Sequence, residues 1–224
     1  MRLPLLLYVL RKAPRVFKGV YIPAEFNKTY DFENLLDFND FEKCNLNVVF
    51  EQDCTFAYSG NCSAKIDDLI YHKKSAIDKP RYAEIEVYIA SRSPSGGIGS
   101  SYGIYFNFEY NQYFYDVLVA CYYGWQIELN ILKNVDTTLT SLFHDYSSQE
   151  VYTDWCLVKT IFSKTDEQVY IKAEVYDQNG NLLISGVGID NDPIPNDGSI
   201  GIAGDDWMVG DVGWIDLLRI YYKY

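Results

Sequence analysis

The chain has 224 residues, 48% hydrophobic and 17% aromatic, and a formal net charge of −12 at pH 7. This size and apolar content suffice for one substantial core, so we expect a single globular domain. The acidic balance argues against nucleic acid as a partner, because phosphate binding needs a concentrated basic face. The 21 Tyr and 12 Phe against 2 Met favour strands over helices, because flat rings pack well on a pleated sheet.

The N-terminal segment differs in charge from the rest of the chain. Its first eighteen positions hold five basic residues and no acid. The apolar run Leu3–Leu10 is too short to span a bilayer. Arg11-Lys12 follows this run where a secretory signal would have small residues at a cleavage site, which disfavours such a signal. Two interpretations stay open for residues 1–28: an extended arm that docks on a neighbour, and a disordered leader.

From Tyr30 onward the sequence consists of strand and turn patterns, without the apolar repeat of a long amphipathic helix. A ring-rich turn at 56–61 leads into a short strand at 63–66. Residues 83–90 alternate apolar and polar side chains, as a half-buried strand does. The Gly/Ser stretch 92–101 is a loop, and it lacks the Lys-Ser/Thr of a phosphate-binding P-loop.

The centre of the chain predicts a series of hairpins. Residues 102–132 form three alternating runs separated by Asn111-Gln112 and by Tyr123-Gly124, which indicates a three-strand meander. Another strand pair is predicted at 153–163 and 168–176. Asn179-Gly180 predicts a type I′ hairpin turn, because both central residues of that turn need positive φ.

The C-terminal stretch 198–224 predicts two strands joined by a loop rich in Gly and Asp. Such a loop is too polar and too rich in Gly to be helical, which implies antiparallel pairing of the two strands. This ending is typical of a two-sheet sandwich.

Several local motifs resemble those of concanavalin A-like (laminin-G-like) jelly rolls, the lectin/glucanase superfamily. They are the Ser-Gly-Asn turn at 59–61, the strand entered by Trp155, and the final strand entered by Trp214-Ile215-Asp216. The resemblance covers roughly residues 30–224 and implies an all-β, concanavalin A-like two-sheet antiparallel jelly-roll sandwich over residues 29–224, after the N-terminal arm of residues 1–28. It is specific to the fold and leaves function open.

The five cysteines contain no C-x-x-C pair, so a zinc site is not supported. Cys44, Cys54 and Cys62 are close enough in sequence for one disulfide, which suits an oxidising environment. Cys121 and Cys156 lie in apolar strand-like runs, where we expect buried free thiols.

Catalysis is not expected. Glucanases of the resembled superfamily use a Glu-x-Asp-x-x-Glu strand, but here only Glu84 and Glu86 are acidic and Ile89 takes the third position. The imidazoles of His72 and His144 have no visible nucleophile partner, and His144 is predicted to lie in a loop.

The resemblance also implies a structural Ca²⁺ where the first and last strands meet. Asp31, Glu33 and Asp216 are the predicted ligands, since Ca²⁺ prefers hard oxygen donors. The acidic loop 190–197 is the alternative location.

A ligand-binding site is predicted at Asp205, Asp206 and Trp207, because a sugar offers C–H groups to an aromatic face and hydroxyls to carboxylates. An exposed Trp can equally anchor a protein neighbour. The sequence therefore leaves two main functions open: a non-catalytic glycan-recognition module, and a structural or attachment protein of an extracellular or virion surface whose arm docks on neighbouring subunits. A glycoside hydrolase or polysaccharide lyase of the same fold is the alternative.

Overall fold

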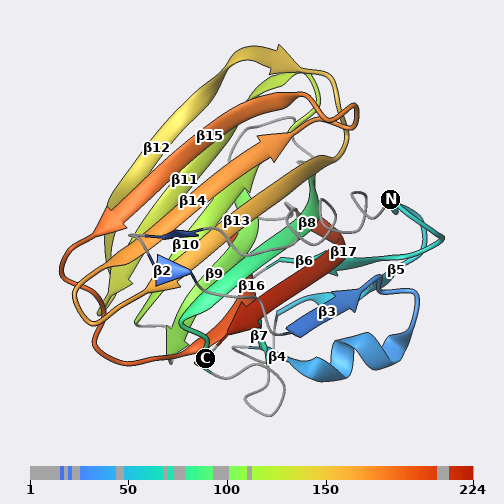
Figure 1. Ribbon diagram of the computed structural model, residues 1–224. Helices are drawn as coiled ribbons and strands as arrows, with labels where there is room; N and C mark the ends of the chain where they lie inside the picture. The colour runs from blue at the N-terminus through green and yellow to red at the C-terminus, as the bar shows by residue number, and fades with distance from the viewer. Residues whose placement is uncertain are drawn as a thin grey trace, which may run out of the picture.

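The computed structural model describes residues 16–17, 20–21, 26–43, 48–67, 70–72, 79–92, 101–109, 113–205 and 212–223. These residues form two antiparallel sheets stacked face to face, together with one separate strand pair (Figure 1). Within the described ranges, a six-residue 3-10 turn, η1 (Leu35–Asp40), is the only helical element. The predicted all-β sandwich is confirmed.

The seven-stranded sheet contains the predicted meander as three consecutive neighbours. Its order is β12 (Thr138–Val151), β11 (Trp125–Val135), β10 (Tyr113–Ala120), β9 (Ser101–Glu109), β16 (Ser199–Asp205), β7 (Ile70–His72) and β4 (Phe41–Lys43).

The eight-stranded sheet has the last strand of the chain near its middle. The predicted pairing of the two C-terminal strands is wrong, because β16 lies in the seven-stranded sheet and the loop after it crosses to this one. Its order is β15 (Leu182–Asp190), β14 (Val169–Tyr176), β13 (Cys156–Lys164), β8 (Tyr82–Arg92), β17 (Val212–Lys223), β6 (Ser63–Ile66) and β5 (Phe50–Asp53), and β3 (Phe26–Tyr30) also pairs with β17. The separate pair is β1 (Val16–Phe17) with β2 (Val20–Tyr21).

The core lies between the sheets because the strands of the eight-stranded sheet turn alternate side chains inward. Buried and half-buried residues alternate without exception along β14. Phe106 of β9 stacks on Phe162 of β13 with ring centroids 4.7 Å apart, which joins the two layers. Burial of one such side chain stabilises the fold by roughly 1.5–3 kcal/mol.

The hairpin at Asn179-Gly180 is confirmed, but its predicted turn type is wrong. Only Gly180 has positive φ, at 82°. The Asp177 carboxylate accepts hydrogen bonds from the backbone N–H groups of Asn179 and Asn181, at 2.9 and 2.8 Å. Because this side chain bonds the turn's N–H groups, one left-handed residue is enough to reverse the chain.

The loop predicted around His144 is also wrong, because His144 lies in the 14-residue strand β12. Most of β12 is exposed on both faces. No apolar alternation therefore marks this strand in the sequence. His144 pairs with Asn130 of β11 in register, and its Nε2 lies 2.9 Å from Glu128 Oε1.

Two disulfides are present among the described residues. The bond Cys54–Cys62 confirms the expected local bridge, while Cys44 lies outside the described residues. The expectation of free thiols at Cys121 and Cys156 is wrong, since these residues form a second disulfide. They come from different sheets, which sequence spacing alone does not reveal. Two disulfides indicate a secreted or extracellular protein.

The N-terminal segment is described only at residues 16–17, 20–21 and 26–28 within the predicted arm. Residues 26–28 begin β3, which pairs with Leu218–Tyr222 of β17. The division into an arm and a domain stays a prediction. Within the described residues, no helix is both long and apolar enough to cross a membrane.

Candidate functional site

One end of the sandwich gathers the connections that carry aromatic residues. At this end β16 stops at Asp205, opposite Ser101, and β17 starts at Val212, opposite Arg92. Cys156, the first residue of β13, pairs with Ile89 near the same end of β8. The register places Trp155, the β14–β15 turn and the connection after Asp205 near one end, which we name the aromatic end. The 53–62 connection leaves β6 near Asp216, farther along β17, and its Phe56 ring reaches Trp155 and Trp214.

Five aromatic side chains form a cluster at the aromatic end. Phe56 stacks on Trp155 with centroids 5.0 Å apart and contacts Trp214 edge-on at the same distance. Tyr58 stacks on Tyr88 at 3.6 Å and lies edge-on to Trp155 at 6.2 Å. The two Trp side chains are buried, whereas Phe56 and Tyr58 are half-buried and present ring surface to solvent. Burial, followed by a hydrogen bond with Tyr58, raises the pKa of Tyr88 to about 12, so this hydroxyl is neutral at physiological pH.

The connection that carries Phe56 and Tyr58 is held by carboxylates. Asp216 Oδ2 accepts from the backbone N–H groups of Tyr58 and Ser59, at 3.0 and 2.9 Å. Glu33 Oε1 accepts from the N–H groups of Asn61 and Cys62, at 2.6 and 3.0 Å. The latter bonds lower the pKa of Glu33, with the Cys62 bond the larger cause, whereas burial raises the pKa of Asp216.

The predicted calcium ligands thus have other partners. Asp216 and Glu33 bond the loop, and Asp31 Oδ1 accepts from the N–H of Glu33 at 3.1 Å. In the part of the chain that the structure describes, no group of three or more His, Cys, Asp or Glu side chains is arranged to hold a metal ion. The geometry assigns these carboxylates to loop stability, and calcium binding there stays a prediction.

An open cavity of about 520 Å³ lies beside the ring cluster. This volume falls within the range of roughly 300–1,000 Å³ for small-molecule sites. Asp154 and Gln178, both exposed, add a carboxylate and an amide to its aromatic wall. The lining includes Phe56, Ala57, Tyr58, Asp154, Trp155 and Gln178. These groups suit a ligand with an apolar face and a hydroxylated edge.

The predicted ligand residues can be placed only in part. Asp205 ends β16 at the aromatic end, while Asp206 and Trp207 lie outside the described residues. Sequence reasoning used Phe56, Tyr58 and Trp155 as signs of the fold and missed them as site residues. The Ser-Gly-Asn turn could have indicated the site, because it lies in the loop that carries the Phe56 and Tyr58 rings.

Glu84 and Glu86 lie on the outward face of β8, away from the core. Glu86 forms ion pairs with Lys159 at 3.0 Å and with Arg219 at 3.6 Å, and Glu84 accepts a hydrogen bond from the Tyr82 hydroxyl. In the cavity wall as described, Asp154 is the one carboxylate. Neither Glu84 nor Glu86 is among the described residues that line this cavity.

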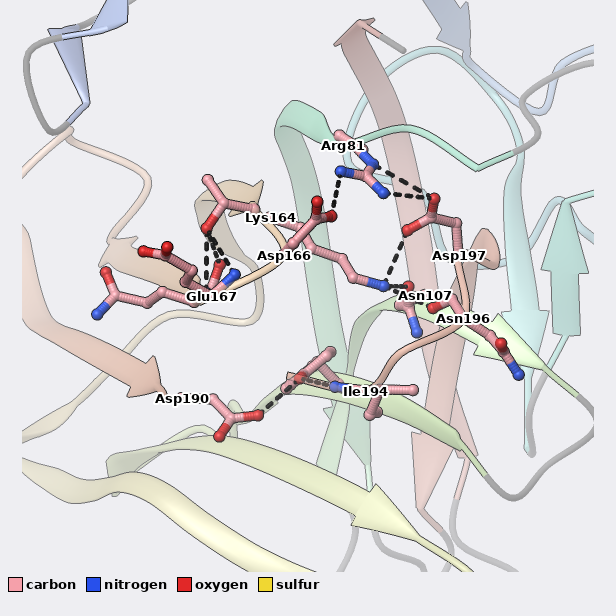
Figure 2. Close-up of polar contacts among 12 residues, drawn as sticks. Arg81, Asn107, Lys164, Asp166, Glu167, Asp190, Ile194, Asn196 and Asp197 are labelled. Carbon is pink, nitrogen blue, oxygen red and sulfur yellow. Dashed lines mark hydrogen bonds and ion pairs between the residues drawn. The ribbon is translucent and has the colours of Figure 1, made fainter. Parts of the chain in front are cut away.

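The opposite end of the sandwich is closed by an ion-pair network (Figure 2). Lys164 Nζ lies 2.8 Å from Asn107 Oδ1 and 2.9 Å from Asp197 Oδ1. Arg81 bridges Asp166 and Asp197 at 2.7 and 3.3 Å. The network holds the 190–198 connection in place at this end.

Comparison with known proteins gives structural matches only. The sequence matches no family model and no curated protein. The GH43 protein BlXynB from Bacillus licheniformis has a TM-score of 0.57 at 10% identity, over 91% of this chain and 41% of that chain. Xylan β-1,4-xylosidase from Bacillus halodurans C-125 has a TM-score of 0.54 at 8% identity, over 93% and 41%.

A lectin from Bauhinia forficata in complex with GalNAc has a TM-score of 0.52 at 11% identity, over 89% of this chain and 99% of that chain. The present chain thus matches a whole lectin, but spans only about two fifths of the GH43 protein and the xylosidase. The topology, the stacked sheets and these matches together establish that the chain has the concanavalin A-like lectin/glucanase fold.

Proposed function

We propose that this protein is a non-catalytic glycan-recognition module that binds sugar in the cavity at the aromatic end. The observation that best supports this proposal is the cavity itself. In it, half-buried Phe56 and Tyr58 lie beside the exposed polar groups of Asp154 and Gln178. Pockets of this kind combine an apolar wall with a few polar groups that fix the orientation of the ligand. The matched lectin with bound GalNAc supports this choice of ligand class.

Asp154 is the residue to test, because its exposed carboxylate can accept hydrogen bonds from sugar hydroxyls. Hydrogen bonds to charged groups contribute about 1.5–3 kcal/mol, so Asp154→Ala should weaken glycan binding roughly 10- to 100-fold. Isothermal titration calorimetry with the best ligand from a glycan array measures this loss. Asp166→Ala, which removes another exposed acid at the opposite end, is the matched control and should bind like the wild type.

The array should include neutral GalNAc and xylose glycans, since the matched GalNAc-bound lectin and the matched xylosidase make these the first probes. Absence of binding to every glycan at millimolar concentration would overturn the proposed function. Release of reducing sugar from a bound glycan, lost in Glu86→Gln, would favour the hydrolase alternative.

A structural or attachment role on a virion or other particle surface is a separate hypothesis that rests on the basic N-terminal segment. Removing residues 1–25 leaves β3 whole, so we expect the shortened chain to keep its cooperative melt. If the segment docks on an acidic neighbour, the shortened chain should lose self-association, as measured by size exclusion with light scattering. Unchanged association would make the segment a passive leader.

A further inference from the structure

A second cavity adjoins the first at the aromatic end. Its volume is about 360 Å³, and its wall includes Glu150, Tyr152, Asp177 and Asn181. The two cavities share two stretches of chain: Tyr152 and Asp154 follow β12, and Asp177 and Gln178 are consecutive in the β14–β15 turn. The cavities are therefore neighbours on one surface.

The segment between the cavities presents its polar and aromatic groups outward. Burial alternates along it, with Val151, Thr153 and Trp155 buried and Tyr152 and Asp154 exposed. Tyr152 and Asp154 thus face solvent together, one at each cavity.

Tyr152 belongs to an exposed aromatic platform. Tyr123 and Tyr152 are 62% and 66% exposed, and their rings meet edge-on with centroids 5.5 Å apart. The Tyr152 hydroxyl donates to Glu150 Oε2 at 2.9 Å. The ring is thus held in position by a second ring and a carboxylate while most of its surface stays open, which pre-organises it for stacking.

The charges around both cavities select among ligands. Their described walls contain the acids Glu150, Asp154 and Asp177 and no Lys or Arg. The whole chain carries a net charge of −12. An anionic polysaccharide would meet repulsion without a compensating cation, so a neutral chain is favoured.

We propose that the two cavities are consecutive subsites for one extended, neutral glycan chain. The protein would then bind internal stretches of a polysaccharide and not single terminal sugars. The proposal rests on the proposed function, because it assigns the same surface a longer ligand. Phe56 and Tyr58 provide the ring surface of the first subsite, and Tyr152, held against Tyr123, provides that of the second.

The test is calorimetry with neutral oligosaccharides of increasing length, from disaccharide to hexasaccharide, in xylan-type and β-glucan-type series. We expect the wild-type Kd to fall at least tenfold along the bound series. Tyr152→Ala should remove most of this gain, at least fivefold for the hexasaccharide, and leave the disaccharide Kd unchanged. Asp154→Ala should weaken every length.

Tyr221→Ala is the control, because this half-buried tyrosine lies on β17 toward the opposite end, where it pairs with Glu84. It should preserve the dependence on length, and thermal melts confirm that each variant is folded. A wild-type Kd that does not change with length, or an equal loss for short and long ligands in Tyr152→Ala, overturns the subsite proposal and leaves the proposed function standing. Tighter binding of an oligogalacturonate ladder overturns the neutral preference. Failure of every oligosaccharide in these series overturns the subsite proposal, and absence of binding to every glycan of the array as well overturns the proposed function.

Discussion

The double variant Cys121→Ala/Cys156→Ala is expected to lose about 4 kcal/mol of unfolding free energy, because its unfolded chain is no longer closed into a loop. The two residues are 35 positions apart, and loop-closure entropy grows with this separation. For a domain of this size the loss corresponds to a fall of roughly 8–16 °C in melting temperature. Urea and thermal denaturation of the oxidised proteins provide the measurement.

Cys54→Ala/Cys62→Ala is the matched control, with a separation of eight residues. The same relation gives about 2.5 kcal/mol for this shorter loop, so the inter-sheet variant should be the less stable of the two. A loss below 1 kcal/mol for Cys121→Ala/Cys156→Ala, or free thiols at both positions in the unreduced wild type, would contradict the expected contribution.

Lys164→Met is expected to cost about 3–5 kcal/mol, the usual loss when one partner of a buried ion pair is removed. The Lys164 side chain is only 3% exposed, and its ammonium faces Asp197 Oδ1, Asn107 Oδ1 and the carbonyl of Asn196. Methionine fills the space but leaves these oxygens without their donor. Arg81→Met removes a 44% exposed partner of the same Asp197 and should cost at most about 1 kcal/mol.

The same pair predicts the response to acid. Burial lowers the pKa of Lys164 and would raise that of Asp197, but hydrogen bonding and charge from Lys164 bring the pKa of Asp197 below its usual value. A carboxylate with a lowered pKa stabilises the fold above its unfolded value, about 4, and this stability is lost as pH falls through the folded value. Urea melts between pH 7 and 2 should therefore show a steeper acid loss in the wild type than in Lys164→Met. Equal slopes would mean that the pair is not formed.

The strands with one buried face could be predicted from the sequence, because their side chains report the faces directly. Residues 83–90 and 168–176 alternate in the sequence and lie in β8 and β14. β12 could not be found in this way, since neither of its faces is covered along most of its length. The Asn179-Gly180 reversal was found, but the role of the Asp177 side chain in its turn was not.

The candidate site was less predictable because its parts converge from distant segments. Phe56 and Trp155 are about a hundred positions apart and stack only after β6 and β13 have taken their places in one sheet. The Cys121–Cys156 bond depends in the same way on the packing of two sheets. The residue types predicted a site that combines aromatic rings with carboxylates. Only the topology shows which rings and carboxylates come together at the aromatic end.

The position of β17 fixes the order in which the fold can be completed during synthesis. This strand lies between β8 on one side and β6 and β3 on the other, and it is made after every other described strand (Figure 1). Until residues 212–223 emerge from the ribosome, one edge of β8 is unpaired, and β3 and β6 lack their pairing with β17. Such late, long-range closure makes folding slow and leaves apolar strands exposed on the nascent chain, where they are open to chaperones and to aggregation.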